Sequence, residues 1–336
     1  MPGPAARHAL LARSGGTRLT DSFGSRLPLA RASIDRDHLS RTLGVEAVLA
    51  DPLARVVVLH ERKVLLAGPA SIAVLEPGGV PAHELALYLG RAIADDGELT
   101  VGAPIVALLV DEATAAELAA DDANWGDLRL LGAALSVRDA GLFTQALALA
   151  NWHASYAFSP RTGHASIPDA AGWTRRDTVT GAELFPRTDA AVIVGITDDD
   201  DRLLLGSNAL WESNRFSLLA GFVEPGESLE AAVIREVYEE SGVHVVDPIY
   251  KGSQPWPFPA SLMVGFRARV APGSSTVGRP DGEEILELRW FSRDELTAAN
   301  AAGEIRLPGA TSIARAIIDD WYGEGRDGRL PDGGRW

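Results

Sequence analysis

Short apolar runs separated by turn-forming residues fill the first part of the chain from about residue 47. They read VEAVLAD, RVVVLHERKVLLA, SIAVLEPGG, ELALYLG and APIVALLVDE, and an alanine-rich stretch follows at residues 112–120. Runs of this length are typical of strands, and the alanine-rich stretch predicts a helix. We therefore expect an N-terminal segment of residues 1–40 and then an α+β domain of residues 41–138 with a largely antiparallel sheet. This domain contains no nucleophile–base pair and no phosphate loop, which favours a scaffold or dimerisation role.

Residues 139–157, DAGLFTQALALANWHASYA, repeat apolar positions every three to four residues and predict a long helix. The sequence from there to residue 185 is rich in turn formers and has no hydrophobic period. A stretch of about 30 residues is too short to form a stable hydrophobic core without a disulfide, a metal ion or another domain to pack on. We therefore expect residues 139–185 to form one helix and a small dependent module.

Residues 186–322 return to strand and helix patterns and predict a second domain of the α/β class. AAVIVGITD and RLLLGSNA flank the turn DDD and predict a hairpin. Further strands are expected at FSLLAGFV, VVDPIY, SLMVGFRARV and LELRWFS, with helices at residues 228–241 and 311–321. The remaining residues 323–336 are expected to be a flexible tail.

Composition narrows the chemistry that these domains can carry. None of the 336 residues is cysteine, which excludes disulfides, thiolate nucleophiles and sulfur-ligated zinc. Acidic residues outnumber basic ones by 46 to 31, and the net charge of −15 argues against general nucleic-acid binding. The N-terminus lacks the apolar core of a signal peptide, and no apolar stretch reaches the length of about 18 residues that spans a membrane. We expect a cytoplasmic protein with no membrane partner.

The candidate chemistry lies in residues 221–243, GFVEPGESLEAAVIREVYEESGV. On a helix, Glu236, Glu239 and Glu240 stand at positions i, i+3 and i+4 and converge on one side. At about 100° per residue, Glu236 and Glu240 fall within about 20° of Leu229, on the stripe that should face the protein. Inward carboxylates are costly unless cations neutralise them, and an all-oxygen set suits Mg²⁺ or Mn²⁺. The alternative is a solvated acidic helix face, against which stand the inward phase and the fixed glycines.

This segment resembles the Nudix box, the signature of hydrolases that cleave nucleoside diphosphates linked to another group. The resemblance implies an α/β/α sandwich with a mixed sheet, a divalent metal, and attack of water on a pyrophosphate. It also implies that Glu239 or Glu240 helps to deprotonate the water, and that Arg235 orients the site by pairing with Glu227 or Glu239. The metal ligands that it implies are Glu236, Glu239, Glu240, Glu284 and the Ala220 carbonyl. For Glu284, the alternative is an exposed acidic loop.

A second motif, SQPWPFPASLM at residues 253–263, is held extended by three prolines. Its rigid aromatic and amide groups are a plausible wall for a flat heterocycle. The motif resembles the one that marks the NADH pyrophosphatase branch of the Nudix family. That resemblance implies that residues 254–261 contact substrate, that Phe185 and Phe222 stack on its base, and that Ala314 contributes backbone to the pocket. Within the motif, the contacts fall to Gln254, Trp256, Phe258 and Ser261. Core packing is the alternative for Phe185 and Phe222.

The resemblance also implies a four-cysteine zinc ribbon before Phe185, as many family members have. This chain has no cysteine at the four ligand positions. The ligand positions hold Ser159, Thr162, Asp177 and Thr180, so no zinc is expected. These four side chains should still converge, and packing should hold the module. The apolar contributors expected are Trp173, Phe158 and Phe185. A metal site rescued by His153 and His164 is the alternative, although such histidines are more often surface or core residues.

Taken together, the resemblance implies a metal-dependent diphosphatase that splits NADH or NAD⁺ into NMN(H) and AMP, active as a homodimer. Two alternatives stay open. The same chemistry on NAD-capped RNA 5′ ends is one, and a non-catalytic Nudix sensor that binds a nucleotide is the other.

Overall fold

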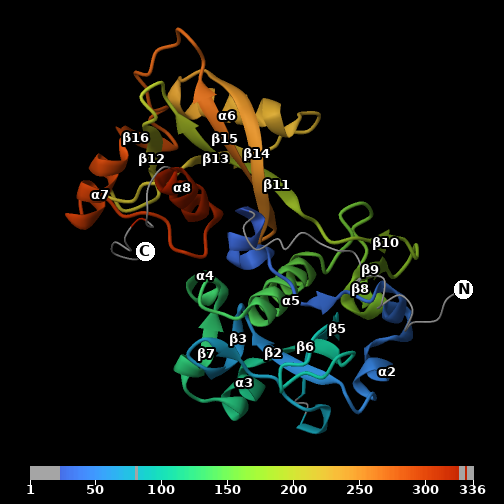
Figure 1. Cartoon of the computed structure of the whole chain (residues 1–336). Coiled ribbons are helices and arrows are strands. Elements are labelled where there is room, and N and C mark those ends of the chain that lie inside the picture. The colour runs from blue at the N-terminus through green and yellow to red at the C-terminus, as the bar shows by residue number, and fades with distance from the viewer. Residues whose placement is uncertain (1–22, 80–81, 325–329, 331–336) are drawn as a thin grey trace, which may run out of the picture.

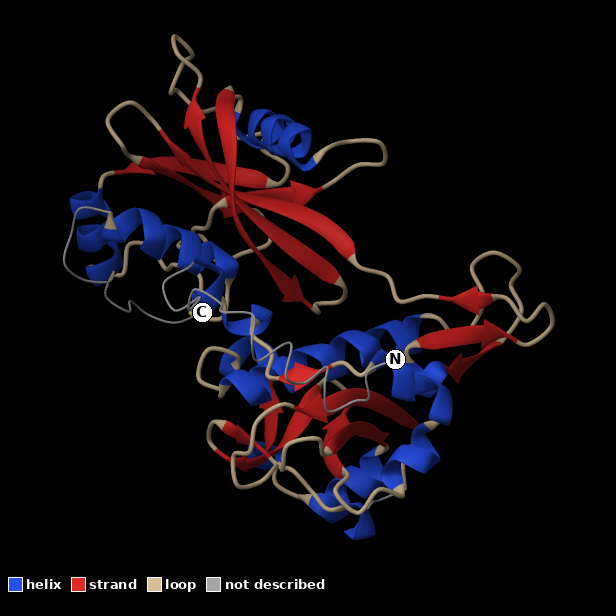
Figure 2. Ribbon diagram, turned by 45° about the vertical axis from the view of Figure 1, so that its right-hand side comes forward, coloured by secondary structure: helices blue, strands red, loops and turns tan. Residues whose placement is uncertain are grey.

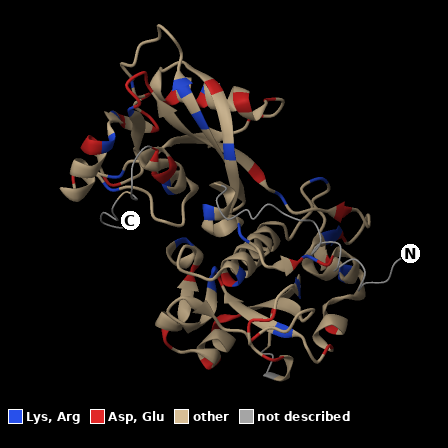
Figure 3. Cartoon of the chain, viewed as in Figure 1, with Lys and Arg blue, Asp and Glu red and all other residues tan. Residues whose placement is uncertain are grey.

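The computed structural model describes residues 23–79, 82–324 and 330. Figure 1 shows two α/β domains, one above the other, with a long helix and a small sheet at their junction. Lys and Arg residues are scattered over both domains (Figure 3). Within the described residues, no helix has the length and apolar character needed to cross a bilayer.

The N-terminal domain is built on a mixed sheet with the strand order β1-β5-β6-β2-β3-β4, and β7 pairs with β3. Among the described strands of this sheet, only β2 and β6 run parallel, so the prediction of a largely antiparallel sheet is confirmed. The strand β1 precedes residue 41, which means that the sheet also draws on the N-terminal segment. The strands are β1 (Ile34–Asp35), β2 (Arg55–His60), β3 (Lys63–Gly68), β4 (Ser71–Ile72), β5 (Leu85–Ala92), β6 (Pro104–Val110) and β7 (Trp125–Asp127).

Helices cover both faces of this sheet. The long helix α5 (Val137–Ser155) packs on one face, where it shares a core with alternate residues of β2 such as Val57 and Leu59. Val56 and Val58 point to the other face, toward α2 (Val45–Leu49) and α3 (Glu112–Leu118). The helices predicted at residues 112–120 and 139–157 are thereby confirmed to within two residues at each end. The remaining short helices are η2 (Phe23–Arg26), η3 (Pro28–Ala30), η4 (His38–Leu43), η5 (Pro77–Gly79), η6 (Asp122–Asn124) and α4 (Leu128–Leu131).

The C-terminal domain has the strand order β14-β15-β11-β12-β16, with β13 paired to β11. Its strands are β11 (Asp189–Thr197), β12 (Leu203–Asn208), β13 (Leu219–Phe222), β14 (Val245–Trp256), β15 (Ser261–Val270) and β16 (Ile285–Phe291). Val192 and Val194 of β11 pack with α6 (Leu229–Ser241), while Ile193 packs on the other face with α8 (Ile313–Gly323). Figure 2 shows this α/β/α sandwich, and the parallel pair β11 and β15 makes its sheet mixed, as predicted.

Three further differences from the predicted C-terminal domain stand out. The helix α7 (Arg293–Ala301) was not predicted, although Ser292 and Glu295 form a reciprocal capping box at its start. The last helix begins and ends two residues later than predicted. In the predicted tail, Leu330 is 2% exposed and its carbonyl accepts a hydrogen bond from Arg315. The other residues of 325–336, like residues 1–22, lie outside the described part of the chain.

The two sheets repeat one arrangement. In the N-terminal sheet, β5-β6-β2-β3 stand in the same order and relative direction as β14-β15-β11-β12 in the C-terminal sheet. In the C-terminal domain, the helix α6 separates β13 from β14, whereas between β4 and β5 the described residues form only η5. The N-terminal domain therefore repeats the sheet without the carboxylate-bearing helix.

The small module consists of β8 (Ser166–Asp169), η7 (Ala170–Gly172), β9 (Thr174–Asp177) and β10 (Glu183–Leu184). Asp177 accepts hydrogen bonds from the Thr162 hydroxyl and from the Thr180 amide, the latter at 2.9 Å, so three of the four side chains expected to converge lie together. These hydrogen bonds lower the pKa of Asp177. Ser159 is also buried, but it donates or accepts no described hydrogen bond with the other three side chains.

The packing predicted for this module is only partly correct. Trp173 donates a hydrogen bond to the Tyr88 carbonyl at 2.7 Å and lies under the Arg41 guanidinium, 3.4 Å from the ring centroid. Phe158 and Phe185, however, are 64% and 67% exposed, so their predicted role in the packing is wrong. The module is therefore held on the N-terminal domain through Trp173, without help from Phe158 or Phe185.

His153 supports this docking as a buried hydrogen-bonding residue. Its Nε2 lies 2.9 Å from the Gly172 carbonyl, and its Nδ1 lies 2.8 Å from Arg175. Burial and the neighbouring Arg175 lower its pKa, which favours the neutral ring. The side chain thus joins the C-terminal part of α5 to the small module.

Candidate active site

The site is organised by the connection from β13 to α6. Gly226 adopts φ +89°, which residues with a Cβ rarely adopt, and allows the sharp turn after Pro225. The Ser228 hydroxyl then caps α6 by accepting the Ala231 amide at 3.1 Å. At the other end, Gly242 in the left-handed region closes the helix with a bond to the Tyr238 carbonyl. The backbone geometry before and after α6 therefore explains why the motif has Gly226, Ser228 and Gly242 at these positions.

Two of the three box carboxylates face inward. Glu240 is 5% exposed and the Glu236 side chain is 15% exposed, which confirms the inward phase predicted from their spacing. Glu239 differs, because its side chain is 57% exposed and lies beside Arg235. The expectation that all three converge on one side is therefore correct only for Glu236 and Glu240.

Gly221 is the backbone surface against which Glu236 rests. A Cβ built at this position would lie 1.9 Å from the Glu236 carboxyl carbon, and 2.1 Å and 2.2 Å from its two oxygens. No side chain fits in that space. The first glycine of the motif thus sets the position of the Glu236 carboxylate.

The buried carboxyls strongly disfavour negative charge. Burial, reinforced by Glu236, Glu284 and Asp281, raises the pKa of Glu240 to about 8. Burial also raises the pKa of Glu236, although the adjacent Arg235 opposes it. The buried Oε2 of Glu240 has no hydrogen-bond partner among the residues that the structure describes. An unpartnered carboxylate oxygen within a cluster of like charges is what a hard divalent cation would satisfy, so these residues fit the expected metal.

Arg235 holds the loop and the helix together. It makes a bidentate pair with Glu227, with Nε to Oε1 at 2.9 Å and Nη2 to Oε2 at 2.8 Å. Its Nη1 lies 2.9 Å from both Glu236 and Glu239, and its Nη2 donates to the Phe222 carbonyl at 3.0 Å. Both partners that were left open for Arg235 are present together.

Glu284 approaches the two inward carboxyls from the loop before β16. The Asp281 carboxylate accepts the amides of Glu283, Glu284 and Ile285, each at 2.9 Å, and fixes this loop. Glu284 is exposed, yet it is near enough to raise the pKa of both Glu236 and Glu240. The backbone amide of Ala220 donates a hydrogen bond to the Glu240 carboxyl group. In the present arrangement, no three acidic or histidine side chains among the described residues lie in one group close enough to share a metal ion, so Glu239 and Glu284 would have to approach the inward pair to complete the expected set.

The residues expected to contact substrate fall into two sets. Phe185 and Phe222 are 67% and 60% exposed, which excludes core packing for both rings. Trp256, Phe258 and Ser261 are half-buried around the turn from β14 to β15, where the Phe258–Pro259 peptide is cis.

Gln254 and Ala314, which are also expected at the substrate pocket, are both buried. Gln254 is 0% exposed, with its Oε1 accepting the Leu29 amide at 3.2 Å and its Nε2 donating to the Thr311 carbonyl at 3.0 Å. Ala314, in the first turn of α8, is 1% exposed and packs into the C-terminal core, and its amide donates to the Ser312 hydroxyl. Both are already engaged inside the protein, a tertiary arrangement that the motif spacing does not reveal.

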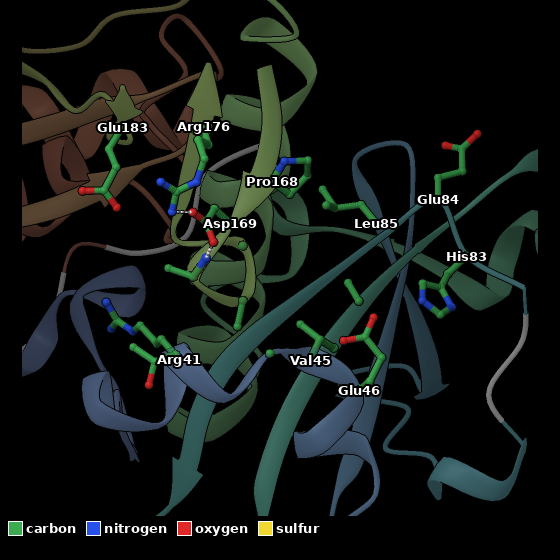
Figure 4. A pocket seen from close by; sticks show the side chains of 16 residues that line it. Arg41, Val45, Glu46, His83, Glu84, Leu85, Pro168, Asp169, Arg176 and Glu183 are labelled. Carbon is green, nitrogen blue, oxygen red and sulfur yellow. Dashed lines mark hydrogen bonds and ion pairs between the residues drawn. The ribbon is translucent and has the colours of Figure 1, made fainter. Parts of the chain in front are cut away.

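A cavity of about 630 Å³ lies away from these carboxylates, between the N-terminal domain and the small module. Arg41, Glu46 and His83 line it from one side, and Asp169, Arg176 and Glu183 line it from the other (Figure 4). Arg176 and Asp169 pair with each other. Sequence reasoning missed this cavity because its lining comes from three separate segments without a shared motif.

Comparison with known proteins identifies the domains. The NUDIX domain matches residues 186–308, and the NADH pyrophosphatase-like rudimentary NUDIX domain matches residues 53–152. The chain belongs to the Nudix hydrolases. Its relatives include NAD-capped RNA hydrolase NudC of Mycobacterium bovis, 41% identical over 312 residues that cover 87% of this chain and 94% of the relative. NAD-capped RNA hydrolase NUDT12 of Homo sapiens is 36% identical over 199 residues, covering 56% of this chain and 42% of the relative.

Proposed function

We propose that this protein is a metal-dependent diphosphatase that hydrolyses the pyrophosphate of NAD(H) to NMN(H) and AMP. The observation that carries the proposal is the inward pair Glu236 and Glu240, with raised pKa values and an unpartnered buried oxygen. A shared divalent cation makes such a pair favourable as carboxylates. The match of residues 53–152 to the NADH pyrophosphatase-like domain supports a dinucleotide substrate.

The residues divide the work as follows. Mg²⁺ or Mn²⁺ would be held by Glu236, Glu239, Glu240, Glu284 and the Ala220 carbonyl, and when bound it neutralises the pyrophosphate and makes its phosphorus more electrophilic. Glu239 or Glu240 accepts the proton of the attacking water. Arg235 keeps the carboxylates and the Phe222 backbone in register. The exposed rings of Phe185 and Phe222 offer stacking surfaces for the base.

Purified protein with Mg²⁺ or Mn²⁺ should convert NADH into reduced NMN and AMP, identified by mass spectrometry. A substrate panel of NAD⁺, ADP-ribose, FAD and diadenosine polyphosphates then ranks the preference. Failure to cleave any dinucleotide with either metal would refute the proposal.

NAD-capped RNA is a second candidate substrate, because the relatives from Mycobacterium bovis and Homo sapiens are named for that activity. The same pyrophosphate would be cut, with the RNA leaving as a 5′-monophosphate. Competition between free NADH and a capped transcript distinguishes the two substrates. Inhibition of decapping by NADH at concentrations near its own KM is expected if both use one site.

A further inference from the structure

We propose that the N-terminal domain holds the SQPWPFP segment in place through contacts from α4 and α5. We call these contacts the clamp, and we propose that Asn151 of α5 is its positioning residue. The inference rests on the proposed function, because it assigns to the rudimentary domain a role in holding part of the substrate site. The N-terminal domain can play this role although its described residues include no counterpart of α6, the helix that carries the carboxylates.

The main contact is made by one amide group. Asn151 Nδ2 donates to the Pro257 carbonyl at 2.8 Å and to the Pro259 carbonyl at 3.2 Å. Proline lacks an amide hydrogen, so Pro257 and Pro259 donate no backbone hydrogen bond to a neighbouring strand. An external donor that reaches both carbonyls fixes the turn between β14 and β15. Figure 1 shows the lower end of β14 near α5, the helix that carries Asn151.

Aromatic contacts add a second fixing point. The guanidinium of Arg129, from α4, lies 4.5 Å from the Phe258 ring centroid and 5.6 Å from that of Trp256. The two rings themselves meet edge to face at 4.8 Å, and both pack against the core of the N-terminal domain. Cation–π contact of this kind holds the rings in one orientation.

Gln254 closes the clamp at the start of the segment. Its buried amide links the Leu29 backbone to the Thr311 carbonyl, and the Thr311 hydroxyl accepts the Ala133 amide of the N-terminal domain at 3.2 Å. Leu27 and Leu29, only two residues apart, lie in the cores of the C-terminal and N-terminal domains respectively. The segment is therefore bound to the junction at both ends, which explains why Gln254 is buried.

The test replaces Asn151 with Asp, which turns the donor into an acceptor facing two carbonyls, and with Leu, which removes the amide. Asn124→Asp, at an exposed position of the same domain, is the matched control. We expect both Asn151 variants to raise the KM for NADH by about tenfold with kcat within about twofold. Hydrogen exchange in residues 253–261 should increase, while the control matches the wild type.

Arg129→Gln serves as a second variant that leaves the hydrogen bonds intact, and a smaller shift in the same direction is expected. The inference is overturned if exchange in residues 253–261 stays at the wild-type level, or if exchange rises without any change in KM. Wild-type protein that cleaves no dinucleotide would defeat the proposed function alone. In that case the exchange measurement still decides whether Asn151 holds the segment.

Discussion

At the scale of single residues, the site depends on where each carboxylate lies relative to bulk water. Glu240 is buried without a partner for one oxygen, Glu236 is pressed on Gly221, and Glu239 remains exposed beside Arg235. Three glutamates of one sequence pattern therefore have three different environments. The most buried of them should show the largest effect of pH on the stability of the protein.

The pKa of about 8 for Glu240 lies above its ordinary value of 4.5, so the folded state retains a proton that the unfolded state releases between these values. Stability from this group is fully present below pH 4.5 and is lost as the pH rises toward 8. Glu240→Gln stays neutral and escapes that loss. Without divalent metal, the variant should exceed the wild type at pH 8 by about 2 kcal/mol or more.

Thermal unfolding between pH 5 and pH 8 measures this difference, with Glu230→Gln as the control. Glu230 lies on the same helix but is exposed, so its curve should follow the wild type. Parallel curves for wild type and Glu240→Gln would contradict the assigned environment of Glu240.

Arg235→Lys should separate charge from geometry. Lysine keeps the positive charge but cannot form the bidentate pair with Glu227 while also reaching Glu239 and the Phe222 carbonyl. We expect kcat for NADH to fall by about 10-fold to 100-fold. Arg161→Lys at an exposed position is the control, and wild-type turnover in Arg235→Lys would show that the fork geometry is unimportant.

At the scale of elements, the close approach of β13 to α6 is the feature most sensitive to a single atom. Gly221→Ala places a methyl group on the Glu236 carboxyl group, so that carboxylate must move. Activity should fall by about 100-fold while the circular dichroism spectrum is retained. Gly68→Ala, where a Cβ meets nothing within 4 Å, is the matched control. Full activity in Gly221→Ala would remove Glu236 from the proposed site.

The small module offers a second prediction at this scale. Asp177 gathers the Thr162 hydroxyl and the amides of Val179 and Thr180. Asp177→Ala should therefore increase amide exchange in β9 and β10 and leave α5 protected. Asp199→Ala, in an exposed turn, serves as the control. Unchanged exchange would mean that docking through Trp173 and His153 maintains the module without Asp177.

At the scale of the whole molecule, the sequence predicted the features that depend on spacing within a single helix or strand. The inward phase of Glu236 and Glu240 followed from helical spacing, and the strands of the mixed sheet followed from their apolar runs. The helix α7 was missed because RDELTAANA has few apolar residues to mark a period. The burial of Gln254 and the exposure of Phe158 depend on how distant segments meet, which spacing along one segment does not encode. The outward turn of Glu239 does follow from spacing, because at about 100° per residue it lies about 80° from Leu229, away from Glu236 and Glu240.

The same strand arrangement also has a different role in each of the two domains. The C-terminal sheet carries the carboxylate helix, while the N-terminal sheet lacks it and instead contributes α4 and α5 to the junction. This division accounts for a rudimentary domain in an enzyme whose chemistry lies elsewhere.

The most direct measurement is the rate of NADH cleavage as Mg²⁺ or Mn²⁺ is titrated, for wild type, Glu240→Gln and Glu230→Gln in parallel. The account predicts that wild type and Glu230→Gln release reduced NMN and AMP only when metal is added. Glu240→Gln should remain folded and inactive at every metal concentration. Metal-independent cleavage, or undiminished turnover by Glu240→Gln, would contradict the central claim that these buried carboxylates form the catalytic metal site.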